Sequence, residues 1–240
     1  MPRFFSNVIL NDVIEIVGND AKHISKVLRM NIGEPLTVCD LKGYDYECKI
    51  KAIDAAKVTL KIEKKIKSVT EPSVKISLYQ GVPKGDKFDF IVQKAVELGV
   101  SEIIPVCMER CIVRIEEKNI NKKIERYNRI ALEAAKQSNR SQLPVVKPFV
   151  SYIEALNKMQ QSDFSILFYE KSNLSLKSVI PDIKPKRISI IVGPEGGFSN
   201  SEIQIAQSLK VAIASMGKRI LRCETAPMYA LSVLMFLFEN

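Results

Sequence analysis

The 240-residue sequence lacks features that several common classes of protein need. It has no tryptophan and one histidine, His23, and of its five cysteines only Cys107 and Cys111 are closely spaced. A structural zinc site is therefore not expected, and the cysteine pattern favours a cytoplasm with reduced thiols. The most apolar stretch, residues 229–238, is far shorter than the ~20 residues that span a bilayer. We expect a buried C-terminal helix there, and neither a metal nor a membrane partner.

The N-terminal stretch "MPRFFSNVIL" has no long apolar core and no small-residue cleavage site, so no secretory signal is expected. Apolar residues make up 46% of the sequence and charged residues 26%, which is typical of a soluble globular protein. The net charge of +9 favours a polyanionic partner. Residues 73–150 alone carry 14 basic and 9 acidic groups, which is +5 of that total.

The first part of the chain, residues 1–70, has the pattern of a small β-barrel. Alternating apolar and polar residues predict strands over residues 13–17, 35–40, 46–53 and 57–65. One helix is expected between the first two strands, over residues 20–30, with Asp20 as its N-cap. Ile24, Val27 and Leu28 would then share its apolar face.

After a polar stretch at residues 68–73, the pattern changes to strands that alternate with helices. Strands are predicted over residues 74–82, 102–108, 165–170, 187–193 and 211–216, and a helix over residues 87–99 that Gly99 closes. This alternation indicates a mostly parallel sheet covered on both faces. We therefore expect a second, α/β domain over residues 73–240.

A long basic helix is predicted over residues 118–140. Its apolar stripe leaves a set of cations to face elsewhere, namely Lys122, Lys123, Arg126, Arg129 and Lys136. Two interpretations remain open: an ordinary solvated helix face, or a surface that contacts RNA phosphates.

The most informative stretch is "IIVGPEGGFSNSEI", residues 190–203, where an apolar run ends in a glycine-rich turn that opens into a helix. It has neither the lysine and hydroxyl group of a P-loop nor the glycine spacing of a dinucleotide-binding loop. The carboxylate of Glu195 would also repel a phosphate. The ligand is therefore expected to be neutral or cationic near the turn, or to contact only the backbone. A turn without any ligand is the alternative. Ser199 and Asn200 are candidate N-caps for the following helix, with Glu202 in its first turn.

A second glycine turn, in "MGKRILRCETAPMYAL" at residues 216–231, also follows a predicted strand. It carries Lys218, Arg219 and Arg222, and Thr225 is a candidate N-cap for the C-terminal helix. Two turns after strands of one sheet are expected to lie together at its carboxyl edge, where α/β sheets bind ligands. An arginine there is suited to stabilise negative charge that develops during a reaction.

These segments together resemble the ribosomal RNA small subunit methyltransferase E family (RsmE) of the SPOUT class. The pair GPEGG and ILR-x-ETA is the most specific feature. Similar segments follow the family order along nearly the whole chain: "PRFF", "HISKVLRMNIGEPLTVCD", "LYQGVPKGDKFDFIVQKAVELGVSEIIPV" and "EAAKQSNR". One departure is Cys223, where related sequences more often carry threonine or another small polar residue.

The resemblance implies an α/β domain of the SPOUT type with a deep trefoil knot, preceded by a PUA-like RNA-binding β-barrel. It also implies a homodimer that uses S-adenosyl-L-methionine to methylate N3 of one uridine in the decoding region of 16S rRNA. The substrate would be this RNA or the assembled small ribosomal subunit. Glu195 does not conflict with such a cofactor, which carries a sulfonium and an ammonium but no phosphate.

Site residues follow from the same resemblance. Three loops would hold the cofactor through Phe168, Tyr169, Glu170, Val192, Gly193, Gly196, Gly197, Met216, Gly217, Ile220, Leu221, Arg222 and Thr225. Uridine N3 must lose a proton, and arginine stabilises the resulting anion rather than acting as a base. Arg222 and Arg3 are therefore the candidate charge stabilisers, and Glu195 and Glu224 the candidate bases. RNA contacts are expected from Arg3, His23, Arg29, Lys84, Lys122, Lys123, Arg126 and Arg140.

Three other interpretations compete with this one. A non-catalytic RNA chaperone leaves both glycine turns without a role, and a nucleotide hydrolase lacks its phosphate-binding lysine. A SPOUT methyltransferase that acts on another rRNA site or on tRNA is the closer competitor, because RNA is selected by its shape and by splayed bases.

Overall fold

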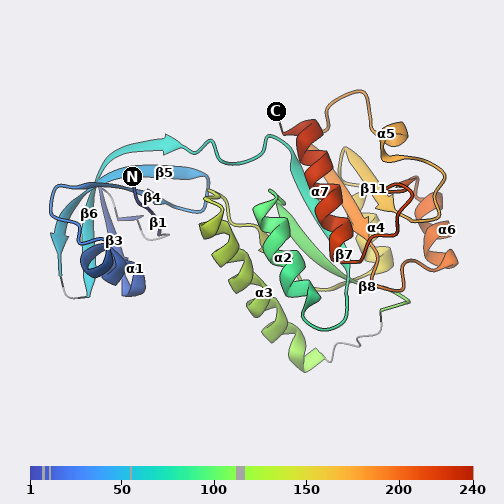
Figure 1. The fold of residues 1–240 in the computed structure, drawn as a ribbon, viewed down its shortest axis with the longest axis horizontal. Helices are drawn as coiled ribbons and strands as arrows, with labels where there is room; N and C mark the ends of the chain where they lie inside the picture. The colour runs from blue at the N-terminus through green and yellow to red at the C-terminus, as the bar shows by residue number, and fades with distance from the viewer. Residues whose placement is uncertain (7–8, 11, 55, 112–116, 240) are drawn as a thin grey trace. The chain divides into compact units, whose positions relative to one another are not determined.

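The computed structural model describes residues 1–6, 9–10, 12–54, 56–111 and 117–239 (Figure 1). These residues form two compact units. Unit 1 comprises Met1–Glu71 together with Asn139–Leu143, and unit 2 comprises Pro72–Ser138 together with Pro144–Asn240.

Unit 1 is built on one six-stranded sheet in the order β1-β4-β5-β6-β3-β2. The pairing of β1 with β4 is parallel, and the other pairings are antiparallel. Alternate residues of the strands point to one face, where Ile14, Leu36 and Leu60 are fully buried. The sequence predicts a small β-barrel here, and its predicted strands all belong to this one sheet. The strands are β1 (Arg3–Phe5), β2 (Ile9–Leu10), β3 (Val13–Val17), β4 (Pro35–Cys39), β5 (Tyr44–Ile53) and β6 (Lys57–Lys67).

The helical segment of unit 1 differs from its prediction. It begins earlier, as α1 (Gly18–Lys22), and continues as a π-helix, η1 (His23–Val27). Val17 rather than Asp20 occupies the N-cap position, so Asp20 lies in the first turn. The shared apolar face is also wrong, because Ile24 is buried whereas Val27 and Leu28 are 66% and 41% exposed. A π-helical turn shifts the angular position of each side chain, which a strict 3.6-residue period does not anticipate.

Unit 1 also includes a short segment from far along the chain. The carboxylate of Glu71 accepts the backbone N–H groups of Ser141 and Gln142 at 2.7 and 2.9 Å. It also pairs with the Arg140 guanidinium at 2.5 Å. The sequence pattern assigns residues 139–143 to the second domain, because nothing local in them indicates such a distant partner.

Unit 2 contains a seven-stranded sheet in which every pairing between described strands is parallel. The order is β10-β8-β7-β12-β11-β13, with β9 paired to β8. The three strands β12, β11 and β13 are therefore direct neighbours. The bounds are β7 (Lys75–Gly81), β8 (Glu102–Cys107), β9 (Val145–Val146), β10 (Val150–Ser151), β11 (Phe164–Phe168), β12 (Arg187–Val192) and β13 (Ala212–Ala214).

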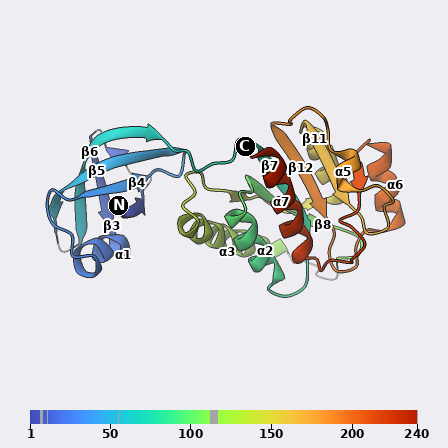
Figure 2. The ribbon, with the colours of Figure 1, turned by 45° about the horizontal axis from the view of Figure 1, so that its top comes forward.

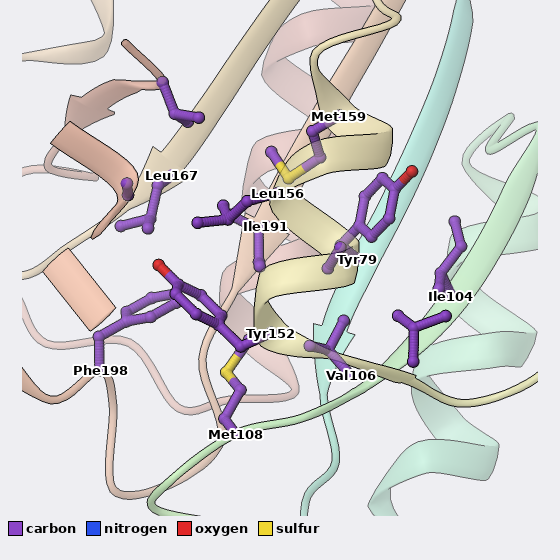
Figure 3. Close-up of a cluster of buried hydrophobic side chains, with 14 residues drawn as sticks. Tyr79, Ile104, Val106, Met108, Tyr152, Leu156, Met159, Leu167, Ile191 and Phe198 are labelled. Carbon is purple, nitrogen blue, oxygen red and sulfur yellow. The ribbon is translucent and has the colours of Figure 1, made fainter. Parts of the chain in front are cut away.

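Helices cover both faces of this sheet (Figures 1 and 2). On one face α2 packs against α3 and α7, and on the other α4 packs against α6. Tyr79 and Ile191 of the strands meet Leu156 of α4 in the core of the second face (Figure 3). The helices are α2 (Lys87–Glu97), α3 (Glu117–Gln137), α4 (Tyr152–Met159), α5 (Leu176–Val179), α6 (Asn200–Ser208) and α7 (Thr225–Phe238).

Helix α6 begins in a capping box, with Ser199 of the two candidate residues as its N-cap. The Ser199 hydroxyl accepts the N–H of Glu202, and the Glu202 carboxylate accepts the N–H of Ser199 at 2.8 Å. The second oxygen of the same carboxylate accepts the backbone N–H of Glu109 at 3.0 Å. Glu202 is only 5% exposed, so it satisfies two backbone donors away from water.

We predict that Glu202→Ala destabilises the protein by about 2–4 kcal/mol, because the buried N–H of Ser199 and the partly buried N–H of Glu109 lose their acceptor. Glu154 is the matched control, since it occupies the same helical position in α4 while its side chain is half exposed and paired with Lys158. Glu154→Ala is expected to cost less than about 1 kcal/mol. Urea unfolding of both variants measures the difference, and equal losses would contradict the prediction.

Candidate functional site

Three loops at the carboxyl ends of β11, β12 and β13 surround one cavity of about 450 Å³. They contribute residues 168–170, 192–198, 216–217 and 219–223 to its lining. Lys87 of α2 and Ala226 of α7 complete the wall. The convergence of the two glycine turns at one edge of the sheet, predicted from the sequence, is what the structure shows.

Twelve of the thirteen residues predicted to hold a cofactor line this cavity. Thr225 does not, and it does not cap α7 either: the N-cap is Glu224, and Thr225 is the first residue of the helix. The N–H of Thr225 donates to the carbonyl oxygen of Arg222 at 2.9 Å. Ala226, one residue further, lines the cavity instead. The prediction missed this because α7 begins at Thr225, one residue earlier than a Thr225 cap requires.

The glycine turn after β12 depends on close approach of its backbone to other segments. Gly197 has a φ of +63°, a region in which other residues are strained, and its N–H donates to the Pro194 carbonyl at 2.9 Å. A Cβ atom at Gly196 would lie 2.9 Å from Cβ of Arg110. Arg110 in turn donates to the Gly196 carbonyl oxygen at 2.9 Å. The turn is therefore fixed by its contacts with the loop after β8.

Beneath the turn lies Gln80, a fully buried side chain at the end of β7. Its amide nitrogen donates to the carbonyl oxygens of Gly81 and Gly193, at 3.0 and 3.3 Å. Its own Oε1 has no hydrogen-bond partner among the described residues. Through these hydrogen bonds, the buried side chain of Gln80 fixes the position of the start of the turn relative to the sheet.

Glu195, at the centre of the turn, is tied to the start of α2. Its carboxylate accepts the backbone N–H of Lys84 at 3.1 Å and pairs with the Lys87 ammonium at 2.9 Å. Burial alone would raise the pKa of Glu195, but the hydrogen bonds from Lys87 and from backbone N–H groups outweigh it and lower the pKa. Glu195 is therefore ionised at neutral pH and is a weak base.

Glu224 does not line the cavity but lies beside it, with its carboxylate 3.6 Å from the same Lys87 ammonium. Burial acts to raise its pKa, while hydrogen bonds from Cys223 and its own backbone, with the nearby cations Lys87 and Arg222, lower it overall. Burial raises the pKa of the Cys223 thiol to about 12, so the thiol is neutral at physiological pH. The arrangement gives the two predicted bases little proton affinity.

Arg222 lines the cavity, and its side chain is exposed. Arg219 of the same loop is a second lining cation, which the sequence places in the second glycine turn but which was not predicted as a site residue. The other lining residues that were not predicted are Lys87, Pro194, Phe198, Cys223 and Ala226. Most of these stand inside the quoted turns and differ from the predicted residues only in position. Lys87 comes from a distant segment, and no local signal marks it.

Four of the predicted RNA contacts lie in unit 1. Arg3 pairs with Asp45 at 2.8 Å and donates to the Asn139 carbonyl oxygen, and Arg140 is 5% exposed and paired with Glu71. Both arginines therefore have structural roles in this unit. His23 and Arg29 are exposed, and Arg29 has a φ of 52°. None of the four contributes to the cavity lining.

The other predicted RNA contacts lie in unit 2. Lys84 and Lys122 are exposed, and Lys123 is half-buried. Arg126 pairs with Asp89 and, at 3.4 Å, with Asp86, so part of its charge is already compensated. These contacts do not test whether the basic helix contacts RNA phosphates.

The part of the chain that the structure describes holds no cluster of three or more histidine, cysteine, aspartate or glutamate side chains able to bind a metal ion. None of its helices combines the length and the apolar character that crossing a membrane requires.

Residues 70–235 match the family model described as an RNA methyltransferase domain, and residues 16–63 match an RNA methyltransferase PUA domain. The chain is 34% identical to the ribosomal RNA small subunit methyltransferase E of Bacillus subtilis, over 100% of this chain and 98% of that protein. It is also 34% identical to the protein of the same name from Buchnera aphidicola (Acyrthosiphon pisum), over 100% and 95% of the two chains.

Solved structures agree with these matches. The ribosomal RNA small subunit methyltransferase E of Neisseria gonorrhoeae, bound to S-adenosyl methionine, superposes with a TM-score of 0.84 at 33% identity and covers 99% of this chain and 98% of its own. A methyltransferase from Legionella pneumophila with bound cofactor gives 0.85 at 28% identity, with the same coverage. The predicted fold class is confirmed. The chain has a PUA-like domain followed by an RNA methyltransferase domain of the SPOUT type. It thus belongs to the ribosomal RNA small subunit methyltransferase E family.

Proposed function

We propose that this protein is an enzyme that uses S-adenosyl-L-methionine to methylate ribosomal RNA of the small subunit. The observation that carries the proposal is the cavity enclosed by the three loops after β11, β12 and β13. The family to which the chain belongs indicates the reaction class, and the cavity provides a binding site for the cofactor. An enzyme with this substrate works where ribosomes are made, which supports a cytoplasmic location.

The residues of the cavity fit this cofactor. Its volume lies within the range of about 300–1,000 Å³ that is usual for small-molecule sites. Apolar walls come from Phe168 and Leu221, and carboxylates from Glu170 and Glu195. The cations Lys87, Arg219 and Arg222 also line it, so the apolar walls suit an aromatic base and the mixed charges suit a zwitterionic ligand. When bound, S-adenosyl-L-methionine supplies an activated methyl group.

The finer proposal is that the acceptor is N3 of a uridine in the decoding region of 16S rRNA. N3 becomes nucleophilic only when its proton leaves, and the negative charge then spreads to the flanking carbonyl oxygens. The guanidinium of Arg222 is an exposed cation on the cavity wall, suited to stabilise that charge. The low pKa values of Glu195 and Glu224 favour this mechanism over general-base catalysis by either carboxylate.

We expect S-adenosyl-L-methionine and S-adenosylhomocysteine to bind the purified protein, whereas ATP should not. The cavity lacks a P-loop lysine, and Glu195 would repel phosphate groups near the turn. Isothermal titration calorimetry with the three ligands measures this directly. Tight binding of ATP with no binding of either methionine derivative would contradict the proposal.

Arg222→Ala is expected to slow methyl transfer about a hundredfold, because one charge-stabilising donor is lost from the transition state. Lys218→Ala is the control, since Lys218 is an exposed cation of the same loop that does not line the cavity. Single-turnover methylation of 16S rRNA at saturating RNA and cofactor separates this effect from binding. An unchanged rate in Arg222→Ala would remove the residue from the mechanism, and mapping the methylated base tests the assignment to uridine N3.

We further propose that the protein works as a homodimer through α7. One side of this helix is buried in unit 2, including Ala230, Leu231 and Leu234. The other side exposes Tyr229, Phe236 and Leu237 by 37%, 84% and 44%. Tyr229 and Phe236 lie two turns apart on the same side of the helix, so they form a continuous apolar strip. A symmetric interface places this strip against its own copy.

Phe236→Asp should therefore shift the protein from dimer to monomer, because it places a charge in the centre of that interface. Val69→Asp is the control, since Val69 is 95% exposed in unit 1 and outside the proposed interface. Sedimentation equilibrium at micromolar concentration gives the oligomeric state of each variant. A wild-type monomer, or a Phe236→Asp dimer, would count against the proposal.

A further inference from the structure

Lys87, the first residue of α2, connects segments that are distant in the sequence. Its ammonium lies 2.9 Å from a carboxylate oxygen of Glu195, in the turn after β12. It also lies 3.6 Å from a carboxylate oxygen of Glu224, at the end of the loop after β13. The thiol sulfur of Cys223 is 3.9 Å away. One side chain from α2 thus touches two of the three loops that enclose the cavity.

Lys87 fixes the position of the glycine turn and also neutralises the charge of Glu195 in that turn. Glu195 is held twice by the same short stretch of chain, by the Lys84 N–H and by the Lys87 ammonium. The stretch leads directly into α2, which packs on the sheet through Phe88, Ile91 and other buried residues. The turn and the loop after β13 are therefore both anchored to the start of α2.

Charge balance depends on the same residue. Without Lys87, the carboxylates of Glu195 and Glu224 would face each other beside the cavity with no cation between them. Hydrogen bonding to Glu195 raises the pKa of Lys87, so the ammonium stays charged at physiological pH. The side chain is 39% exposed, and its partners Glu195 and Glu224 are 29% and 19% exposed. The network is thus partly shielded from water.

We infer that Lys87 is a positioning residue of the methyl transfer: it holds the glycine turn and the Arg222–Glu224 segment in one fixed geometry by bridging Glu195 and Glu224. This inference rests on the proposed function, and it gives Glu195 the role of an anchor point instead of a base. A displaced turn misplaces both the cofactor cavity and the Arg222 guanidinium, and small displacements of reacting groups have large effects on rate.

The test compares Lys87→Met with Lys94→Met. Lys94 is the matched control, because it lies on the same helix, pairs with one carboxylate, Glu97, and is 37% exposed. We expect Lys87→Met to lower the single-turnover rate by about ten- to a hundredfold. Its affinity for S-adenosylhomocysteine, measured by calorimetry, should also fall, while Lys94→Met behaves like the wild type. Lys87→Arg, which keeps the cation, should recover most of the rate.

A double variant separates positioning from general loss of structure. Glu195→Gln keeps an acceptor for the Lys84 N–H but removes the charge that Lys87 neutralises. We expect Glu195→Gln alone to lower the rate less than Lys87→Met does, because the Lys84 N–H still holds the side chain, and Lys87→Met/Glu195→Gln to be faster than Lys87→Met. Removing both members of a charge pair leaves no uncompensated charge behind. Damage to packing alone would not be repaired in this way.

The outcomes are distinct. Lys87→Met with wild-type rate and wild-type affinity overturns the inference and leaves the proposed function standing. Loss of activity in Glu195→Gln with wild-type affinity for S-adenosylhomocysteine makes Glu195 a base, and this also overturns the inference. A wild-type protein that binds neither S-adenosyl-L-methionine nor S-adenosylhomocysteine ends the proposed function, and the role of Lys87 with it.

Discussion

The parallel pairing of β12, β11 and β13 is the constraint on which the site depends. Parallel neighbours present their carboxyl ends at the same edge, so the loops that follow them meet whatever their separation in the sequence. Phe168 pairs with Val192 on one side and with Ala214 on the other, so all three strands end at one level. The cavity follows from that shared level. No loop in this group could form it alone.

A second layer of contacts holds the loops once the strands have brought them together. The Gln80 amide donates to the carbonyl oxygen of Gly193, and Arg110 donates to the carbonyl oxygen of Gly196. The Lys87 ammonium pairs with the carboxylate of Glu195. Glu202 then joins α6 to the loop after β8 through the Glu109 N–H. Each contact uses a side chain from a different element. The turn is thus over-determined, as expected where backbone geometry positions a ligand.

The charges around the cavity form one connected system. Glu195 and Glu224 would weaken each other's ionisation if they stood alone, but Lys87 lies between them and both pKa values are lowered. The paired carboxylates therefore stay charged and do not compete for protons. Arg222 retains an exposed guanidinium beside them. This division of roles explains why a glycine turn can carry a glutamate at its centre without binding phosphate.

The sequence by itself determined the period of each element and the chemistry of the turns. The alternation of strands and helices predicted the parallel sheet, and the residues after the glycine turn predicted the start of α6 at Ser199 or Asn200, because both depend on residues a few positions apart. The absence of a phosphate-binding lysine likewise required no structure. Local pattern failed at η1, where a π-helical turn exposes Val27 and Leu28, and at α7, where the helix begins at Thr225. Only the tertiary structure decided that residues 139–143 join Glu71, and that Lys87 joins Glu195 and Glu224. These partners are separated by dozens of residues or more, and their pairing depends on the packing of whole elements, which no local pattern of side chains encodes.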